Sequence, residues 1–181
     1  FEAGTQPEAE RNTGKGSAMH DDEFKNLAVV SVRQAENLGT VDDLQLDVTE
    51  HRVSALLLRG GMFREGPMVP WTDVRSVGRD AIMVEGSDAA VARTAGETLI
   101  SLDTLRNTQV VGDNGELAGT ISGVDVDPET GNVIAYIVAA PEGGGLFHQA
   151  PRFRVEPAAV KAIGPKLITI NAAAVNFQSE S

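Results

Sequence analysis

Alternating apolar and polar residues predict a protein made of short β-strands. The clearest stretch covers residues 119–140 and reads GTISGVDVDPETGNVIAYIVAA. An alternating run and a β-branched run flank the turn formers of residues 127–132. Pro128 presets φ at the start of this turn, and Gly131 can take the positive φ that reverses the chain. The stretch therefore predicts a β-hairpin.

Shorter patterns of the same kind predict the remaining elements. The expected strands outside the hairpin are residues 29–32, 39–47, 53–58, 68–71, 81–84, 110–111, 153–155 and 167–170, with a strand and turn over 99–105. Two short helical turns are expected at residues 72–77 and 157–163, because apolar residues share one face and glycine follows each segment.

The two halves of the sequence repeat these features in the same order. The triplet at residues 39–41 (GTV) recurs 80 residues later as GTI at 119–121, and residues 53–58 recur at the same spacing as 133–138. A Gly-Gly-apolar-Phe loop recurs after 84 residues, and the segment 74–78 recurs after 86. The growing spacing indicates small loop insertions in a duplicated fold.

Composition divides the chain into five parts. Residues 1–22 are polar and form a flexible acidic arm, because they cannot bury enough apolar surface to become ordered alone. The first repeat unit spans 23–85 and the second spans 98–172. The small polar residues 86–97 form a linker between the units, and residues 173–181 form a C-terminal tail.

Charge and composition exclude several classes of function. The 181 residues carry a net charge of -11, which argues against direct binding of nucleic acid. There is no cysteine, so disulfides, thiol nucleophiles and thiolate metal sites are excluded, and a reducing compartment fits. No apolar run approaches the roughly 20 residues of a membrane span, so we expect a cytoplasmic protein with no transmembrane span of its own. Aromatic residues are 4% of the chain, so the core must be aliphatic.

Both repeats resemble the PRC-barrel family. The family pattern is a strand of the form G-T/K-V-x-D-hydrophobic-x-hydrophobic-D, a return strand, Val-Pro, a short V-x-x-I/V-G element and a last strand. Here it reads GTVDDLQLD, VSALLL, VPWTDVRSVG and AIMVE, and then GTISGVDVDPETGNVIAYIVAA, VEPAAVKAIG and LITI. The resemblance covers roughly residues 24–172. The second repeat departs from it at residues 156–158 (EPA), which puts the local register there in doubt.

The resemblance implies an all-β fold of two tandem, small PRC-type β-barrels with short helical turns. The family includes the cytoplasmic domain of the H subunit of photosynthetic reaction centres and the C-terminal domain of a ribosome-maturation factor. Its members with known roles dock on proteins, and the domain itself is not catalytic in them.

The residues give little support for catalysis or for a cofactor. The three histidines, His20, His51 and His148, fall in unlike contexts, so neither a Ser-His-Asp arrangement nor a histidine metal site is indicated. Residues 125–131 only faintly resemble a calcium loop, because Thr130 stands where such a loop needs glycine. The glycines at 143–145 lack the Lys-Ser/Thr of a phosphate loop. We therefore expect no catalytic residue, metal or cofactor.

Acidic residues in the predicted strands are expected to face water. They are Asp42, Asp43, Asp47, Asp125 and Asp127. A solvated face is the usual meaning of such a pattern, although in a reaction-centre setting acids of this kind could also pass protons toward a quinone.

Two equivalent loops carry the best candidate for a binding site. The loops read GGMFREGP and GGLFHQAP, and each places a large apolar pair between glycine and proline. The pairs are Met62 with Phe63 and Leu146 with Phe147. Exposed apolar groups mark contact sites, so these four residues are predicted to bind a protein. The alternative is that both phenylalanines plug the open end of their own barrel.

The sequence thus predicts a non-catalytic adaptor whose tandem barrels dock on a larger assembly. One alternative is an accessory, H-like cytoplasmic subunit of a membrane photosynthetic complex, held peripherally at its cytoplasmic face. Another is a helper of ribosome or RNA maturation that would act by binding a basic ribosomal protein.

Overall fold

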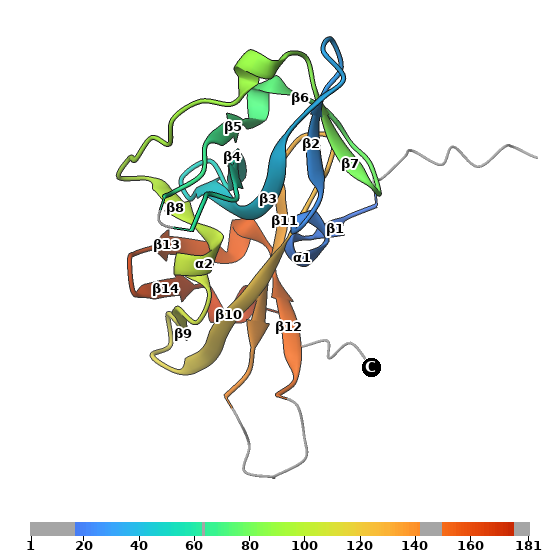
Figure 1. The fold of residues 1–181 in the computed structure, drawn as a ribbon. Coiled ribbons are helices and arrows are strands. Elements are labelled where there is room, and N and C mark those ends of the chain that lie inside the picture. The colour runs from blue at the N-terminus through green and yellow to red at the C-terminus, as the bar shows by residue number, and fades with distance from the viewer. Residues whose placement is uncertain (1–16, 63, 142–149, 176–181) are drawn as a thin grey trace, which may run out of the picture.

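The computed structural model describes residues 17–62, 64–141 and 150–175, and within them it forms two seven-stranded sheets (Figure 1). The first half of the chain, residues 17–97, contributes β1 (Met19–His20), α1 (Asp21–Phe24), β2 (Ala28–Ser31), β3 (Glu36–Asp47), β4 (Arg52–Leu58), β5 (Met68–Pro70), η1 (Trp71–Asp73), β6 (Val74–Val77), β7 (Ala81–Val84) and η2 (Ser87–Ala89). The second half, residues 98–175, contributes β8 (Leu99–Ser101), α2 (Leu102–Leu105), β9 (Gln109–Gly112), β10 (Leu117–Val126), β11 (Val133–Ala139), β12 (Arg152–Val155), η3 (Pro157–Ala159), β13 (Val160–Ile163), β14 (Leu167–Ile170) and η4 (Ala172–Ala174).

The two sheets have the same strand order, which confirms an all-β, two-unit repeat. The first runs β5-β4-β3-β2-β7-β6, and the second runs β12-β11-β10-β9-β14-β13. Within each sheet one pair is parallel, β2 with β7 and β9 with β14, and the other pairs are antiparallel. The hairpin expected at 119–140 is the β10–β11 pair.

Each half is completed by the first strand and helix of the other half. Strand β1 belongs to the first half by sequence but pairs with β10, with His20 opposite Asp125. Strand β8 belongs to the second half but pairs with β3, with Ser101 opposite Gln45. Figure 1 shows β1 and α1 beside the strands of the second half, and β8 and α2 beside β3. The two halves therefore exchange equivalent elements.

This exchange differs from the simple order of arm, unit and linker that composition suggests. Residues 17–22 lie in or just before β1 and α1, and residues 99–101 extend the sheet of the first half. Residues 86–97 are also tied to the first half. Met68 and Val91 exchange backbone hydrogen bonds of 2.8 Å, and the side-chain Nε2 of Gln45 donates to the carbonyl of Thr94 at 3.1 Å.

The turns of the two central hairpins meet at the centre of the molecule. The amide of Val53 donates to the carbonyl of Gly131 at 2.8 Å, and the amide of Val133 donates to the carbonyl of His51 at 2.8 Å. Val133 is the repeat equivalent of Val53, and Gly131 is that of His51, 80 positions later in each case. The two bonds are therefore equivalent to each other and indicate a local two-fold symmetry between the two turns. Both turn residues have positive φ, 77° for Gly131 and 49° for His51.

One hydrophobic core runs through both halves. Phe24, at the end of α1, lies 6.3 Å from the ring of Trp71, measured between centroids. The core is otherwise mostly aliphatic, as the low aromatic content predicts, and it includes Val41, Leu44, Leu46, Leu56, Leu58, Ile82, Leu102, Leu105, Val110, Ile121, Val124, Tyr136, Val138, Ile168 and Ile170. Because a single core spans the exchange, neither half encloses a complete core of its own.

The two expected helical turns are present, but each ends after three residues. The helical turns expected at 72–77 and 157–163 are each one 3₁₀ turn followed by a strand, β6 or β13, because the β-branched residues that follow the turn pair with β7 or β14. The register at β12 is regular, since Val155 lies opposite Tyr136 as Val69 lies opposite Leu56.

The expectation that the strand acids face water is wrong for two of them. Asp43 and Asp125 are only 5% and 6% exposed. Register shifts interrupt the regular alternation of β3 next to Asp43 and of β10 next to Asp125. The exchanged elements then cover these positions, with α2 against β3 and β1 against β10.

Candidate docking loop and inter-half groove

The two ends of the loop at residues 59–67, which we call its neck, lie so close together that only glycine fits there. The amide of Leu58 donates to the carbonyl of Pro67 at 2.9 Å, which closes the base of the loop. A Cβ on Gly60 would lie 1.8 Å from the carbonyl oxygen of Arg64, and one on Gly66 would lie 2.2 Å from that of Leu58. The backbone strands of the neck therefore approach more closely than any side chain would allow.

Arginine side chains fasten this neck to the rest of the first half. The guanidinium of Arg93 donates to the carbonyl oxygens of Gly66 at 2.8 Å and Leu58 at 2.9 Å. Arg59 donates from Nη2 to the Asn26 side chain at 2.8 Å. The neck is thus fixed at both sides.

Met62 sits at the tip of this loop and is 90% exposed. It is the most exposed large hydrophobic side chain of the described residues, since the others with notable exposure reach at most 49%. Met62 therefore does not enter the barrel. The other three predicted contact residues, Phe63, Leu146 and Phe147, lie outside the described residues.

A cluster of charged side chains joins the start of the first half to the second half. His20 Nδ1 lies 2.9 Å from an Asp125 carboxylate oxygen, and Arg154 forms an ion pair with the other oxygen of Asp125. Arg106 forms an ion pair with Asp21, which is 1% exposed. Sequence reasoning placed His20 in the flexible arm and therefore missed this cluster.

Asp21 is a buried carboxylate with fixed hydrogen-bond partners. Burial raises its pKa, while the amide of Val124, which donates to it at 2.8 Å, and the charge of Arg106 act in the opposite direction. The partners come from the second half, so the carboxylate helps to hold α1 on β10.

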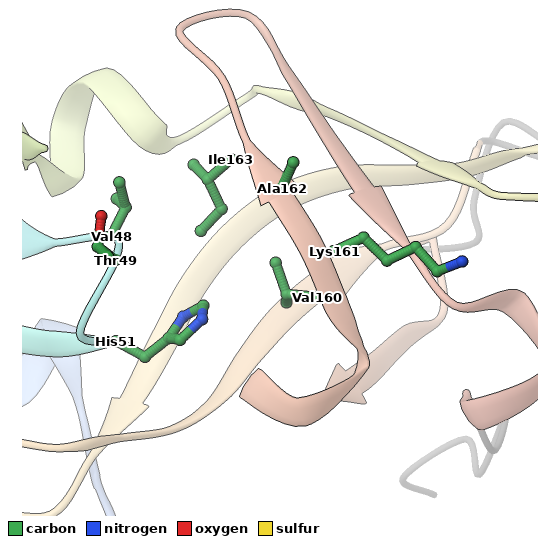
Figure 2. Close-up of a pocket in the computed structure, with 7 residues that line it drawn as sticks. All are labelled: Val48, Thr49, His51, Val160, Lys161, Ala162 and Ile163. Carbon is green, nitrogen blue, oxygen red and sulfur yellow. The ribbon is translucent and has the colours of Figure 1, made fainter.

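A polar groove of about 250 Å³ lies between the two halves (Figure 2). It is lined by Val48, Thr49 and His51 from the turn after β3, and by Val160, Lys161, Ala162 and Ile163 of β13. Figure 2 shows the His51 ring directed across the groove toward Val160.

His51 is held by the only tyrosine of the chain. Its Nδ1 lies 2.7 Å from the hydroxyl of Tyr136, and the two rings meet edge to face. Burial raises the pKa of Tyr136, so this hydroxyl stays protonated. Burial also lowers the pKa of His51, against the opposing charges of Asp47 and Glu50. The pair is therefore a neutral hydrogen bond across the joint between the halves near pH 7.

The histidines that the structure describes do not come together in one site. His20 and His51 belong to separate clusters, and within residues 17–62, 64–141 and 150–175 there is no group of three or more histidine and acidic side chains that could hold a metal ion. His148 lies outside the described residues. In the part of the chain that the structure describes, no helix has the length and apolar character needed to cross a membrane.

The repeated strand order of the two sheets defines a tandem small-barrel protein. A family model described as the PRC-barrel domain matches residues 17–91 and again residues 97–175. The chain belongs to the PRC-barrel domain family.

Two relatives each match less than two fifths of this chain but most of their own length. An uncharacterized protein of Clostridium acetobutylicum is 32% identical over 74 residues, which cover 38% of this chain and 85% of the relative. A probable sporulation protein, YlmC, of Bacillus subtilis is 32% identical over 73 residues, which cover 36% of this chain and 90% of the relative.

Proposed function

We propose that this protein is a non-catalytic adaptor that docks on a protein assembly through the loop at residues 59–67. The observation that carries the proposal is Met62, an unbranched apolar side chain that is 90% exposed at the tip of a loop with a fixed neck. A flexible thioether side chain adapts to irregular partner surfaces, and burying it on a partner is favourable. A fixed neck lowers the ordering cost of that contact.

The charge of the chain supports a protein partner. With a net charge of -11, the surface would repel phosphate backbones and would attract a basic protein surface. The absence of cysteine supports a cytoplasmic location. Attachment to a photosynthetic membrane complex and a role in ribosome maturation stay predictions of the family resemblance.

The test is site-specific photo-crosslinking in the source cells. A photoreactive amino acid at position 62 should capture a discrete protein, whereas the same group at Leu117, 49% exposed in the other half, should not. Met62→Ser should abolish co-purification of the captured protein while leaving the urea midpoint unchanged. Equal capture at both positions, or co-purification unaffected by Met62→Ser, would contradict the proposal.

A further inference from the structure

Equivalent positions at the joint between the halves carry different residues. The first residue of α1 is Asp21, and the first residue of α2 is Leu102. Asp21 lies against Gly123 of β10, and the strand residue of β3 that is equivalent to Gly123 is Asp43. The contact of α1 with β10 and the equivalent contact of α2 with β3 are therefore built from different residues.

Each of these two versions of the contact has one carboxylate, which comes from the helix in one version and from the strand in the other. In one version Asp21 of α1 accepts the amide of Val124, and Gly123 leaves room for it, since a Cβ there would lie 2.4 Å from the Asp21 oxygen. In the other version Asp43 of the strand accepts the amides of Leu44 at 2.8 Å and Asp103 at 3.0 Å.

In that second version the helix position equivalent to Asp21 is apolar, since it is held by the buried Leu102. Val124 and Leu44 are equivalent strand residues, so the same backbone donor is satisfied in both versions by a carboxylate from a different element.

The central turns show the same kind of matching. Gly131 lies under the indole of Trp71, and a Cβ there would be 2.6 Å from the indole nitrogen. At the equivalent place the turn residue is the larger His51. The position equivalent to Trp71, the first residue of η3, is Pro157, and His51 bonds to Tyr136 of the second half. The small turn residue Gly131 thus contacts a tryptophan of the first half, and the larger turn residue His51 bonds to a tyrosine of the second half.

Pairing a half with its own copy would mismatch both places. Two first halves would set Asp21 against Asp43, which would place two carboxylates in one buried position, and would set His51 under Trp71, where even a methyl group does not fit. Like charges and steric overlap would both oppose that pair.

Two second halves would fail for the opposite reason. Leu102 would face Gly123 with no carboxylate, so the amides of Val124 and Asp103 would each lose their acceptor. An unsatisfied buried amide is costly. Gly131 would also leave the Tyr136 hydroxyl without the His51 nitrogen.

We propose that these matched pairs make the two halves selective for each other, so that a first half pairs with a second half and not with a copy of itself. Selectivity of this kind requires features that disfavour the wrong pair as well as features that favour the right one. This inference is independent of the docking loop, whose residues lie elsewhere in the chain.

The first test transplants one version of the joint into the place of the other in the intact chain. Gly123→Asp alone and His20→Ser with Asp21→Leu should each lower the urea midpoint. The triple variant combines His20→Ser, Asp21→Leu and Gly123→Asp, and so places the equivalents of Ser101, Leu102 and Asp43 where α1 meets β10. It should recover at least half of the stability that the two partial variants lose when their losses are added. If the triple variant loses as much stability as the two partial variants lose together, the matched-carboxylate interpretation is overturned.

The second test measures selectivity directly. A protease site inserted between Ala95 and Gly96 allows the folded chain to be cut, unfolded in urea and refolded, and native mass spectrometry then weighs the pairs. Wild-type protein should give only pairs of a first with a second half. The variant His20→Ser, Asp21→Leu, His51→Gly should also give pairs of first halves. Like pairs from the wild type, or none from the variant, would overturn the proposal.

Discussion

The indole of Trp71 lies against the backbone of Gly131, which belongs to the central turn of the opposite half. This contact joins a 3₁₀ turn of the first half to the hairpin of the second, and Trp71 is the only tryptophan of the chain. Tryptophan fluorescence therefore reports on the joint between the halves and not on one barrel alone.

Gly131→Ala should strongly destabilise the protein. The residue has a φ of 77°, and its Cβ would lie 2.6 Å from the indole, so both backbone strain and overlap oppose the substitution. We expect a loss of about 2–4 kcal/mol in the free energy of unfolding, measured by urea titration of Trp71 fluorescence.

Gly115→Ala is the matched control, because Gly115 has a φ of 84° but no atom within 4 Å of its Cβ position. It should cost only about 1 kcal/mol, from backbone strain. Equal losses for the two variants would show that the contact with Trp71 adds nothing.

Phe24→Ala tests whether the exchange makes the two halves one cooperative unit. Phe24 is fully buried at the end of α1, which packs on β10 of the second half, and its ring lies beside Trp71 of the first. The substitution should cost about 3–5 kcal/mol. Unfolding followed by Trp71 fluorescence and by Tyr136 absorbance should stay a single coincident transition.

Two separate transitions, with only one of them shifted, would contradict this cooperativity. Val32→Ala offers a control of the same kind, because Val32 is 48% exposed and its truncation should move neither signal by a measurable amount.

The hairpins and the repeat could be predicted from the sequence because their signals are local. Residues 127–132 contain proline, asparagine and glycine within one turn, and Gly131 indeed has positive φ. The exchange carries no such signal. It depends on β1, which has two residues, and on α1, which has four, and they pair with a strand about one hundred positions later. Elements this short have no readable period.

The candidate site shows the same division. The exposed apolar residue Met62 could be predicted, because glycine and proline around a large apolar pair form a sequence-local pattern. The burial of Asp43 and the bonding of His20 and His51 could not, because each depends on a side chain or helix from the other half. Only the pairing of the halves gives these polar residues their partners.

Arg93→Ala should loosen the docking loop. The guanidinium of Arg93 satisfies the carbonyls of Leu58 and Gly66, so its removal should cost about 1–3 kcal/mol. The loop should also open more often, and trypsin should cut after Arg64 faster than in the wild type, as measured by mass spectrometry of the digest. Arg33→Ala removes an exposed ion pair with Glu85 and should change neither quantity, so similar effects of the two variants would contradict this role for Arg93.

His51 should make the protein less stable in mild acid. Burial lowers its pKa in the folded state below the ordinary value of 6.5, so near pH 6 the unfolded chain binds a proton more readily than the folded one. The stability that neutral His51 supports is complete above pH 6.5 and is lost as the pH falls below it. Because His51 is half-exposed and solvent screens its charge, the loss should stay below about 1 kcal/mol.

His51→Asn isolates this contribution, since asparagine tolerates the positive φ of 49° at this position. The difference in unfolding free energy between wild type and variant should be largest at pH 7.5 and should shrink by pH 5.5, as measured by urea titration at each pH. Taking the difference removes the opposite effect of Asp21 and Asp43, whose pKa values are raised by burial and whose contribution to stability grows as the pH falls. A difference that widens in acid would mean that the folded state binds the proton more tightly than the unfolded chain, and that His51 acts as a cation toward Asp47 and Glu50.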